Sequence, residues 1–119
     1  MQFKECYQNP FIEERADPYI TLGPDGFYYF TASYPMKSAD DKDGYDRVIL
    51  RRAKDISELT SAEEITIWKV ADTTLTHRFI WAPELHYIAG RWYVFYAGSE
   101  DKENNWAFDC HVLVCDSDD

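Results

Sequence analysis

Two carboxylates stand next to prolines in this chain, and an aromatic segment follows each. Asp17 precedes Pro18, and Glu84 follows Pro83. A proline has no backbone N–H and confines the residue before it to extended geometry, so each pair is typical of the entrance of a strand. A carboxylate held at such a point can take a proton from water or give one to a leaving group. The Asp-Pro dipeptide by itself is more often a simple turn.

The two carboxylates belong to a hairpin that occurs twice. Residues 15–30 and residues 81–95 each contain a strand, a tight turn and an aromatic strand. Self-similarity at a fixed spacing indicates a repeat architecture, in which each unit buries its apolar face against its neighbours. We therefore expect the repeat to frame a site.

The remaining periodicity predicts further strands around each hairpin. In the first unit we expect strands over residues 17–22, 27–33, 47–53 and 65–70, with one short helical turn within residues 56–64. In the second unit we expect strands from Trp81, over residues 91–95 and over residues 110–115. Four antiparallel strands per unit are typical of a β-propeller blade.

The predicted fold is all-β, a partial propeller with about one complete blade and most of a second. The first blade is expected at about residues 12–70 and the second, incomplete, at about residues 80–119. A propeller closes with roughly four or more blades. This chain is therefore not expected to close a ring alone, and it needs further blades or self-association to cover its open strand edges.

Length and charge restrict the classes of partner. A chain of 119 residues is in the size range of one domain, and 45% hydrophobic residues supply a core. The formal net charge of −10 argues against nucleic acid and against an anionic membrane surface as partners. The acidity selects no particular substrate.

Three cysteines and the N-terminal segment bear on the compartment. Cys6, Cys110 and Cys115 are odd in number and follow no metal-ligand spacing, which indicates reduced thiols. Residues 1–6 contain no apolar signal segment, and no stretch approaches the ~18 apolar residues of a membrane span. These features predict a cytoplasmic protein.

One acidic loop resembles a calcium-binding loop without meeting its requirements. Asp40, Asp41 and Asp43 lie close together, but the first ligand position falls on Ala39 and the twelfth on Leu50. The acidic residues 116–119 are typical of a solvated polar end. We expect neither a metal nor a cofactor.

Four motifs, in order, resemble the N-terminal part of glycoside hydrolase family 43. They cover residues 9–20, 26–33, 45–53 and 80–88, and the branch they most resemble is that of the α-L-arabinofuranosidases. The resemblance runs from about Asn9 to the last residue. It implies a five-bladed β-propeller that hydrolyses arabinose- or xylose-containing plant polysaccharides or oligosaccharides with inversion of configuration.

The resemblance also implies roles for particular residues. The family uses an aspartate as general base, a second aspartate that tunes the acid and a glutamate as general acid. The base lies in the Ala-Asp-Pro motif, which places it at Asp17 here, whereas the other two belong to later blades, beyond Asp119. Glu84 lies in a motif that lines the pocket and is not the proton donor. A chain with the base and no acid is expected to lose most of its catalysis.

Weaker candidates for substrate binding surround these motifs. Trp81 offers either a face for a sugar ring or plain core. Glu84 either accepts hydrogen bonds from sugar hydroxyls or pairs with a neighbouring cation. Arg15 either orders a carboxylate network or is exposed ahead of a strand. His86 shares a strand face with Glu84, which makes it a pocket neighbour, while His77 is less favoured.

Two alternatives to the arabinofuranosidase interpretation stay open. In the first, the chain is a non-catalytic truncated fragment that lacks the general acid. In the second, its specificity is that of a β-xylosidase of the same family. Differences in pocket shape separate such sugars by only ~1 to 3 kcal/mol per group.

Overall fold

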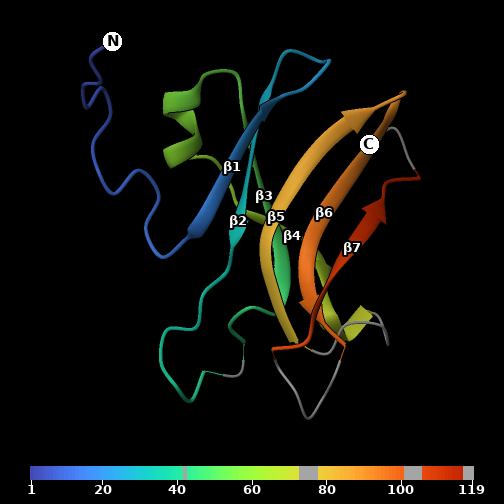
Figure 1. Ribbon diagram of the computed structural model, residues 1–119. Coiled ribbons are helices and arrows are strands. Elements are labelled where there is room, and N and C mark those ends of the chain that lie inside the picture. Colours follow the sequence, from blue (N-terminus) through green and yellow to red (C-terminus); the bar gives the residue numbers. More distant parts are fainter. Residues whose placement is uncertain (42, 73–77, 101–105, 117–119) are drawn as a thin grey trace.

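The computed structural model describes residues 1–41, 43–72, 78–100 and 106–116. The fold is all-β, with two antiparallel sheets packed against each other (Figure 1). The first sheet has the strand order β1 (Ala16–Leu22), β2 (Tyr28–Ser33), β3 (Arg47–Ala53) and β4 (Ile65–Lys69). The second has the order β5 (Arg78–Ile88), β6 (Arg91–Ser99) and β7 (Phe108–Val114). The predicted fold class is thereby confirmed.

The strands of the first unit follow the sequence pattern to within one residue, whereas those of the second unit differ more. Strand β6 runs on to Ser99 and not only to residue 95, and β7 covers Phe108–Val114 and not residues 110–115. The expected helical turn is the 3-10 helix η1 (Ile56–Thr60), and a shorter one, η2 (Val70–Asp72), follows β4. Strand β5 begins at Arg78, before the expected Trp81, because Arg78 pairs with Ser99 and so extends both strands of the hairpin. The long second hairpin therefore reaches beyond its aromatic segment.

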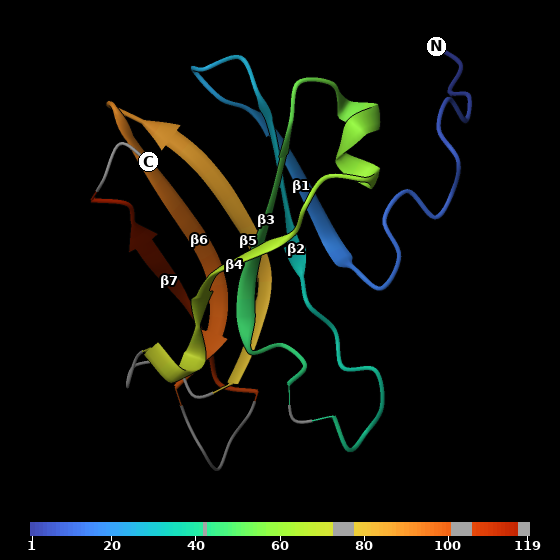
Figure 2. The ribbon, with the colours of Figure 1, turned by 180° about the vertical axis from the view of Figure 1, so that it is seen from behind.

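Two apolar clusters hold the structure together. The first lies between the first sheet and η1, on the face away from the second sheet (Figure 2). The second fills the space between the two sheets. The buried residues of the first cluster are Phe30, Ala32, Ile49, Ala53 and Leu59, and those of the second are Val48, Ile80, Leu85, Val94 and Tyr96. The first sheet therefore buries apolar side chains on both of its faces.

The aromatic strands contribute unequally to these cores. Phe30 is buried, and Tyr29 and Trp92 are half-buried and pack between the sheets. Tyr93 and Phe95 belong to neither cluster; their rings stack on each other on the opposite face of β6 from Val94. Period-2 alternation along β6 accounts for this placement, since Tyr93 and Phe95 point away from the face that carries Val94.

Both hairpins contain a bulge at the residue pair that ends in proline. In the first, Ala16 pairs with Ser33 and Tyr19 with Thr31, so Asp17 and Pro18 together face one residue. In the second, Trp81 pairs with Ala97 and Glu84 with Phe95, and Ala82 and Pro83 again face one residue. Such bulges redirect side chains and often occur next to active sites.

The two hairpins close with different turns. Asp25 fastens the first turn, because its carboxylate accepts hydrogen bonds from the Phe27 N–H at 3.1 Å and from the Tyr29 hydroxyl at 2.7 Å. Burial, together with the hydrogen bond to Asp25, raises the pKa of Tyr29 to about 12. The second turn is only Ala89 and Gly90, both with positive φ, as a two-residue hairpin of type I′ requires.

Candidate active site

A chain of hydrogen bonds joins three strands at the bulged corners. The Ser33 hydroxyl, at the end of β2, donates to Asp17 Oδ2 of β1 at 3.0 Å. The same hydroxyl oxygen accepts the backbone N–H of Ala82, in β5, at 2.8 Å. Ser33 is fully buried, whereas Asp17 is exposed. The buried Ser33 hydroxyl thus holds Oδ2 of the Asp17 carboxylate, while the residue itself is exposed to solvent.

The backbone at Asp17 and at Ala82 has the same unusual conformation. Asp17 has φ of 50° and Ala82 has φ of 46°, both in the left-handed region. The extended geometry expected before each proline is therefore wrong here, because both residues lie in bulges. Each precedes a proline inside its bulge, so the two are equivalent positions of the repeat. By the same equivalence Glu84 corresponds to Tyr19 and not to Asp17. Of the two bulges, only the first carries a carboxylate at the left-handed residue.

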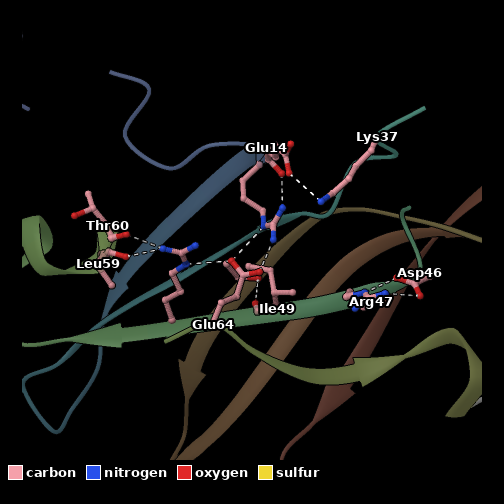
Figure 3. A network of polar contacts seen from close by, with 11 residues as sticks. Glu14, Lys37, Asp46, Arg47, Ile49, Leu59, Thr60 and Glu64 are labelled. Atoms are coloured by element: carbon pink, nitrogen blue, oxygen red, sulfur yellow. Dashed lines mark hydrogen bonds and ion pairs between the residues drawn. The ribbon is translucent and has the colours of Figure 1, made fainter. Parts of the chain in front are cut away.

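Arg15 anchors the start of β1 to the far edge of the first sheet. Its guanidinium donates to Glu64 at 2.5 and 3.2 Å and also to the backbone carbonyl of Glu14 (Figure 3). Arg51 donates to Glu64 from the other side at 3.0 Å. The structure therefore engages Arg15 with Glu64, next to the strand that carries Asp17. Its predicted contact with substrate stays a prediction.

The electrostatics of this network favour a charged Glu64. Burial alone raises the pKa of Glu64, but hydrogen bonds from Arg15 and Arg51 outweigh it and hold the pKa below its ordinary value. The guanidinium of Arg15 also lies 4.2 Å from the centre of the Tyr34 ring, and that of Arg47 lies 4.3 Å from the same ring. The segment that follows Ser33 is therefore held by two cations.

Trp81 lies in an aromatic cluster beside the second bulge. Its ring stacks on Phe108 at 4.3 Å and meets Tyr45, Phe79 and Trp106 at about 6 Å. The indole N–H is buried and has no hydrogen-bond partner among the described residues. One face of the ring is thus covered by Phe108. Whether the indole also touches substrate stays a prediction.

Glu84 and His86 lie on one face of β5, as strand alternation predicts. A ring nitrogen of His86, Nε2, lies 2.9 Å from Glu84 Oε2. The imidazole also packs against Tyr19 of β1, with 5.2 Å between ring centres. Glu84 thus has His86 as a hydrogen-bonding neighbour, and the pair bridges the first strands of the two sheets. Their contact with substrate stays a prediction.

The residues that sequence reasoning missed are Ser33 and the backbone N–H of Ala82. Ser33 ends the first aromatic strand, and a small polar residue there is the one signal that the sequence offers. The pairing of β1 with β2 brings Ser33 to Asp17, and the packing of the two sheets brings it to the Ala82 N–H of β5, which is far away in the chain.

The acidic loop has a structural explanation. Asp41 accepts the backbone N–H groups of Lys37 and Asp43, each at 2.9 Å, and so closes the loop on itself. Within the described ranges no cluster of histidine, cysteine and carboxylate groups suited to a metal occurs. In the same ranges no helix is long and apolar enough to cross a membrane. His77 lies outside the described residues.

The sheets and the corner define the class of protein. Two successive antiparallel sheets, each beginning with a bulged strand, form part of a β-propeller with a carboxylate at the start of its first strand. A sequence profile of glycosyl hydrolases family 43 matches residues 7–119. The chain belongs to this family.

Named relatives agree with the family. Extracellular exo-α-(1→5)-L-arabinofuranosidases of Streptomyces avermitilis and Streptomyces chartreusis are each 42% identical over 107 residues, which is 90% of this chain. The crystal structure of an α-L-arabinofuranosidase from Lactobacillus brevis matches 95% of this chain with a TM-score of 0.75 and 38% identity. The chain spans only 20% and 30% of the two Streptomyces proteins and 34% of the Lactobacillus chain.

The expected cytoplasmic location is wrong. Both Streptomyces relatives are named extracellular, and this finding overturns it. The prediction depended on the absence of an apolar segment at residues 1–6 and on the odd number and the spacing of the cysteines. Neither feature can fix a compartment in a chain that spans less than a third of those relatives.

Proposed function

We propose that this chain supplies the first blades, and the general base, of an inverting glycosidase that removes α-L-arabinofuranosyl units from arabinose-containing saccharides. The first blade covers about residues 12–70 and the second about residues 80–119. The observation that carries the proposal is Asp17, which is exposed in a left-handed bulge and held by a buried serine. The family and the names of its relatives support the class of substrate.

The geometry suits the work of a base. In an inverting reaction an ionised carboxylate removes a proton from water as the water attacks the sugar, and a second carboxyl group protonates the leaving oxygen. The two carboxyl groups stand roughly 6.5–9.5 Å apart so that the water fits between them. Oδ1 of Asp17 has no hydrogen-bond partner among the described residues and can accept a proton from that water. The acid and the tuning aspartate belong to blades beyond residue 119.

The test uses this chain joined to the remaining blades. Residues 7–119 replace the matching third of the Lactobacillus arabinofuranosidase, and turnover of an aryl α-L-arabinofuranoside is measured. We expect Asp17→Ala to lower kcat by roughly 10²- to 10⁴-fold, because the base is removed. Full activity of the Asp17→Ala protein would overturn the assignment.

Azide provides a positive control for the role of the lost group. Azide needs no deprotonation, so in the Asp17→Ala protein it can attack the anomeric carbon while the carbon–oxygen bond to the aryl group breaks. We expect azide to restore release of the phenol and to give an arabinofuranosyl azide of inverted configuration. A retained configuration would contradict an inverting mechanism. Asp25→Ala, in the exposed turn, is the matched control and keeps its activity.

Two measurements address the alternatives. Turnover by the chain alone is expected to be lost, and size-exclusion chromatography is expected to show association through the edge of β7, which pairs with no further strand among the described residues. A monomer with full turnover would contradict this expectation. An aryl β-D-xyloside, assayed beside the arabinofuranoside on the joined protein, separates the arabinofuranosidase from the β-xylosidase specificity.

A further inference from the structure

We propose that Ser33 is a positioning residue for Asp17, and that it couples the catalytic corner of the first blade to the backbone of the second. The proposal deepens the proposed function and rests on it, since it takes Asp17 as the base. Ser33 has one hydroxyl group, and the structure uses both of its hydrogen-bonding capacities. It donates to the Asp17 carboxylate at 3.0 Å and accepts from the Ala82 amide at 2.8 Å.

The direction of these bonds determines what the hydroxyl does. Because the Ala82 N–H can only donate, it occupies a lone pair of the Ser33 oxygen and leaves the hydroxyl proton for Asp17. Ser33 is 0% exposed, so water does not compete for either bond. The hydroxyl rotor is therefore fixed by the second blade, and its proton points to one oxygen of Asp17, Oδ2.

The consequence is a carboxylate with two unlike oxygens. Oδ2 is engaged by Ser33, while Oδ1 has no such partner among the described contacts and is left for the attacking water. Asp17 itself has a left-handed backbone conformation, and among the described residues the hydrogen bond to its side chain comes from Ser33. A misplacement of about 1 Å at a reacting group can cost roughly 10²-fold in rate. The orientation of Asp17 therefore depends on whether the second blade is docked.

The neighbouring strand residue provides a matched control. Thr31 also has a fully buried hydroxyl on β2, which donates to the carbonyl of Ile49 at 2.8 Å and does not touch Asp17. Thr31→Val removes this hydroxyl without changing the shape of the side chain. Ser33→Ala removes the hydroxyl of the proposed relay. Both variants delete one buried hydroxyl from the same strand.

The experiment measures kcat and KM of the joined protein for the aryl arabinofuranoside. We expect Ser33→Ala to lower kcat roughly 10- to 100-fold with little change in KM, because it disturbs the reacting group and not the binding of the sugar. Thr31→Val is expected to keep its kcat. Equal losses in the two variants, or an unchanged kcat in Ser33→Ala, would overturn the proposal.

A double variant distinguishes a role through Asp17 from a general structural role. In the Asp17→Ala protein, the rate of azide-supported turnover should not fall further when Ser33→Ala is added, since the group that Ser33 positions is already absent. A further 10-fold fall would show that Ser33 acts on the fold and not on Asp17. If instead Asp17→Ala is fully active, the proposed function fails. Loss in Asp17→Ala without loss in Ser33→Ala defeats only the role of Ser33.

Discussion

The two hairpins share the same bulged corner before a proline, yet they differ in the side chain that each corner carries. At the left-handed position of the bulge, the first has Asp17 and the second has Ala82. Aspartate visits this conformation more readily than alanine, because its short polar side chain can form local hydrogen bonds. Ala82 has no such help, and its N–H is instead fixed by Ser33 of the other hairpin. The repeat thus builds the same bulged corner in both hairpins, but only the first corner carries a carboxylate at the left-handed residue.

The anchors of the two hairpins differ in the same way. Arg15 lies two residues before Asp17 and is held by Glu64. The equivalent position in the second hairpin, two residues before Ala82, is Ile80, which is fully buried between the sheets. An ion network next to the site and an apolar contact at the equivalent place stabilise the same backbone by different means. Their responses to mutation and to pH should therefore differ.

The largest expected effect comes from moving the carboxylate from one corner to the other. The double variant Asp17→Ala, Ala82→Asp places aspartate in the equivalent bulge of the second hairpin. We expect it to stay roughly 10²- to 10⁴-fold below the parent in kcat, because the water and the sugar are placed for the first corner only. Steady-state kinetics of the joined protein measure this. Recovery of turnover would break the distinction between the corners.

The next effect is on stability and concerns the apolar anchor. Ile80→Ala is expected to lower the free energy of unfolding by about 2–5 kcal/mol, because it leaves a cavity between the sheets. Urea denaturation measures it, and the loss should be the same at pH 7 and at pH 5. Ile20→Ala is the control, since Ile20 is 37% exposed, and it should cost much less. Equal costs would indicate that the two sheets are not tightly packed in solution.

The ionic anchor should respond to acid. Glu64→Gln is expected to lower the free energy of unfolding by about 1–3 kcal/mol at pH 7, because two half-buried arginines lose a charged acceptor. The folded-state pKa of Glu64 is lowered below 4.5, so its contribution is present above pH 4.5 and is lost as the pH falls through the folded-state value. The difference between parent and variant should therefore shrink below pH 4.5.

The neighbouring glutamate provides the control for this pH dependence. Glu63 is exposed and Glu64 is half-buried, although they are adjacent in the sequence. Glu63→Gln is expected to change the free energy of unfolding little, both at pH 7 and below pH 4.5. A pH-independent cost for Glu64→Gln would mean that the network acts through packing alone.

The smallest effect concerns the turns. Ala89 has φ of 49°, which is costly for alanine, and nothing else fastens this turn as Asp25 fastens the first one among the described contacts. We expect Ala89→Asn to raise the free energy of unfolding by up to about 1 kcal/mol, because asparagine tolerates the left-handed region. Thermal unfolding measures it. A loss of stability would show that this turn is not type I′ in solution.

Much of the fold was predictable because it is written in local patterns. Alternating apolar residues located β3 and β4, turn residues located both hairpin loops, and a helical turn fell where η1 is found. The extra length of β5 and β6 was not predictable, since residues 78–80 join the sheet only through pairing with Ser99 and the bulge that follows.

The sequence by itself determined the repeat, the two bulge-forming prolines and Asp17 as the candidate base, since these depend on residue type and near neighbours. Only the tertiary structure decided which side chains act together. The partners of Asp17 and of Arg15 lie far along the chain, as Ser33 and Glu64, and Ser33 in turn meets Ala82 of the other sheet. Hydrogen bonds of this kind depend on strand register and on the docking of two sheets, which no local pattern contains.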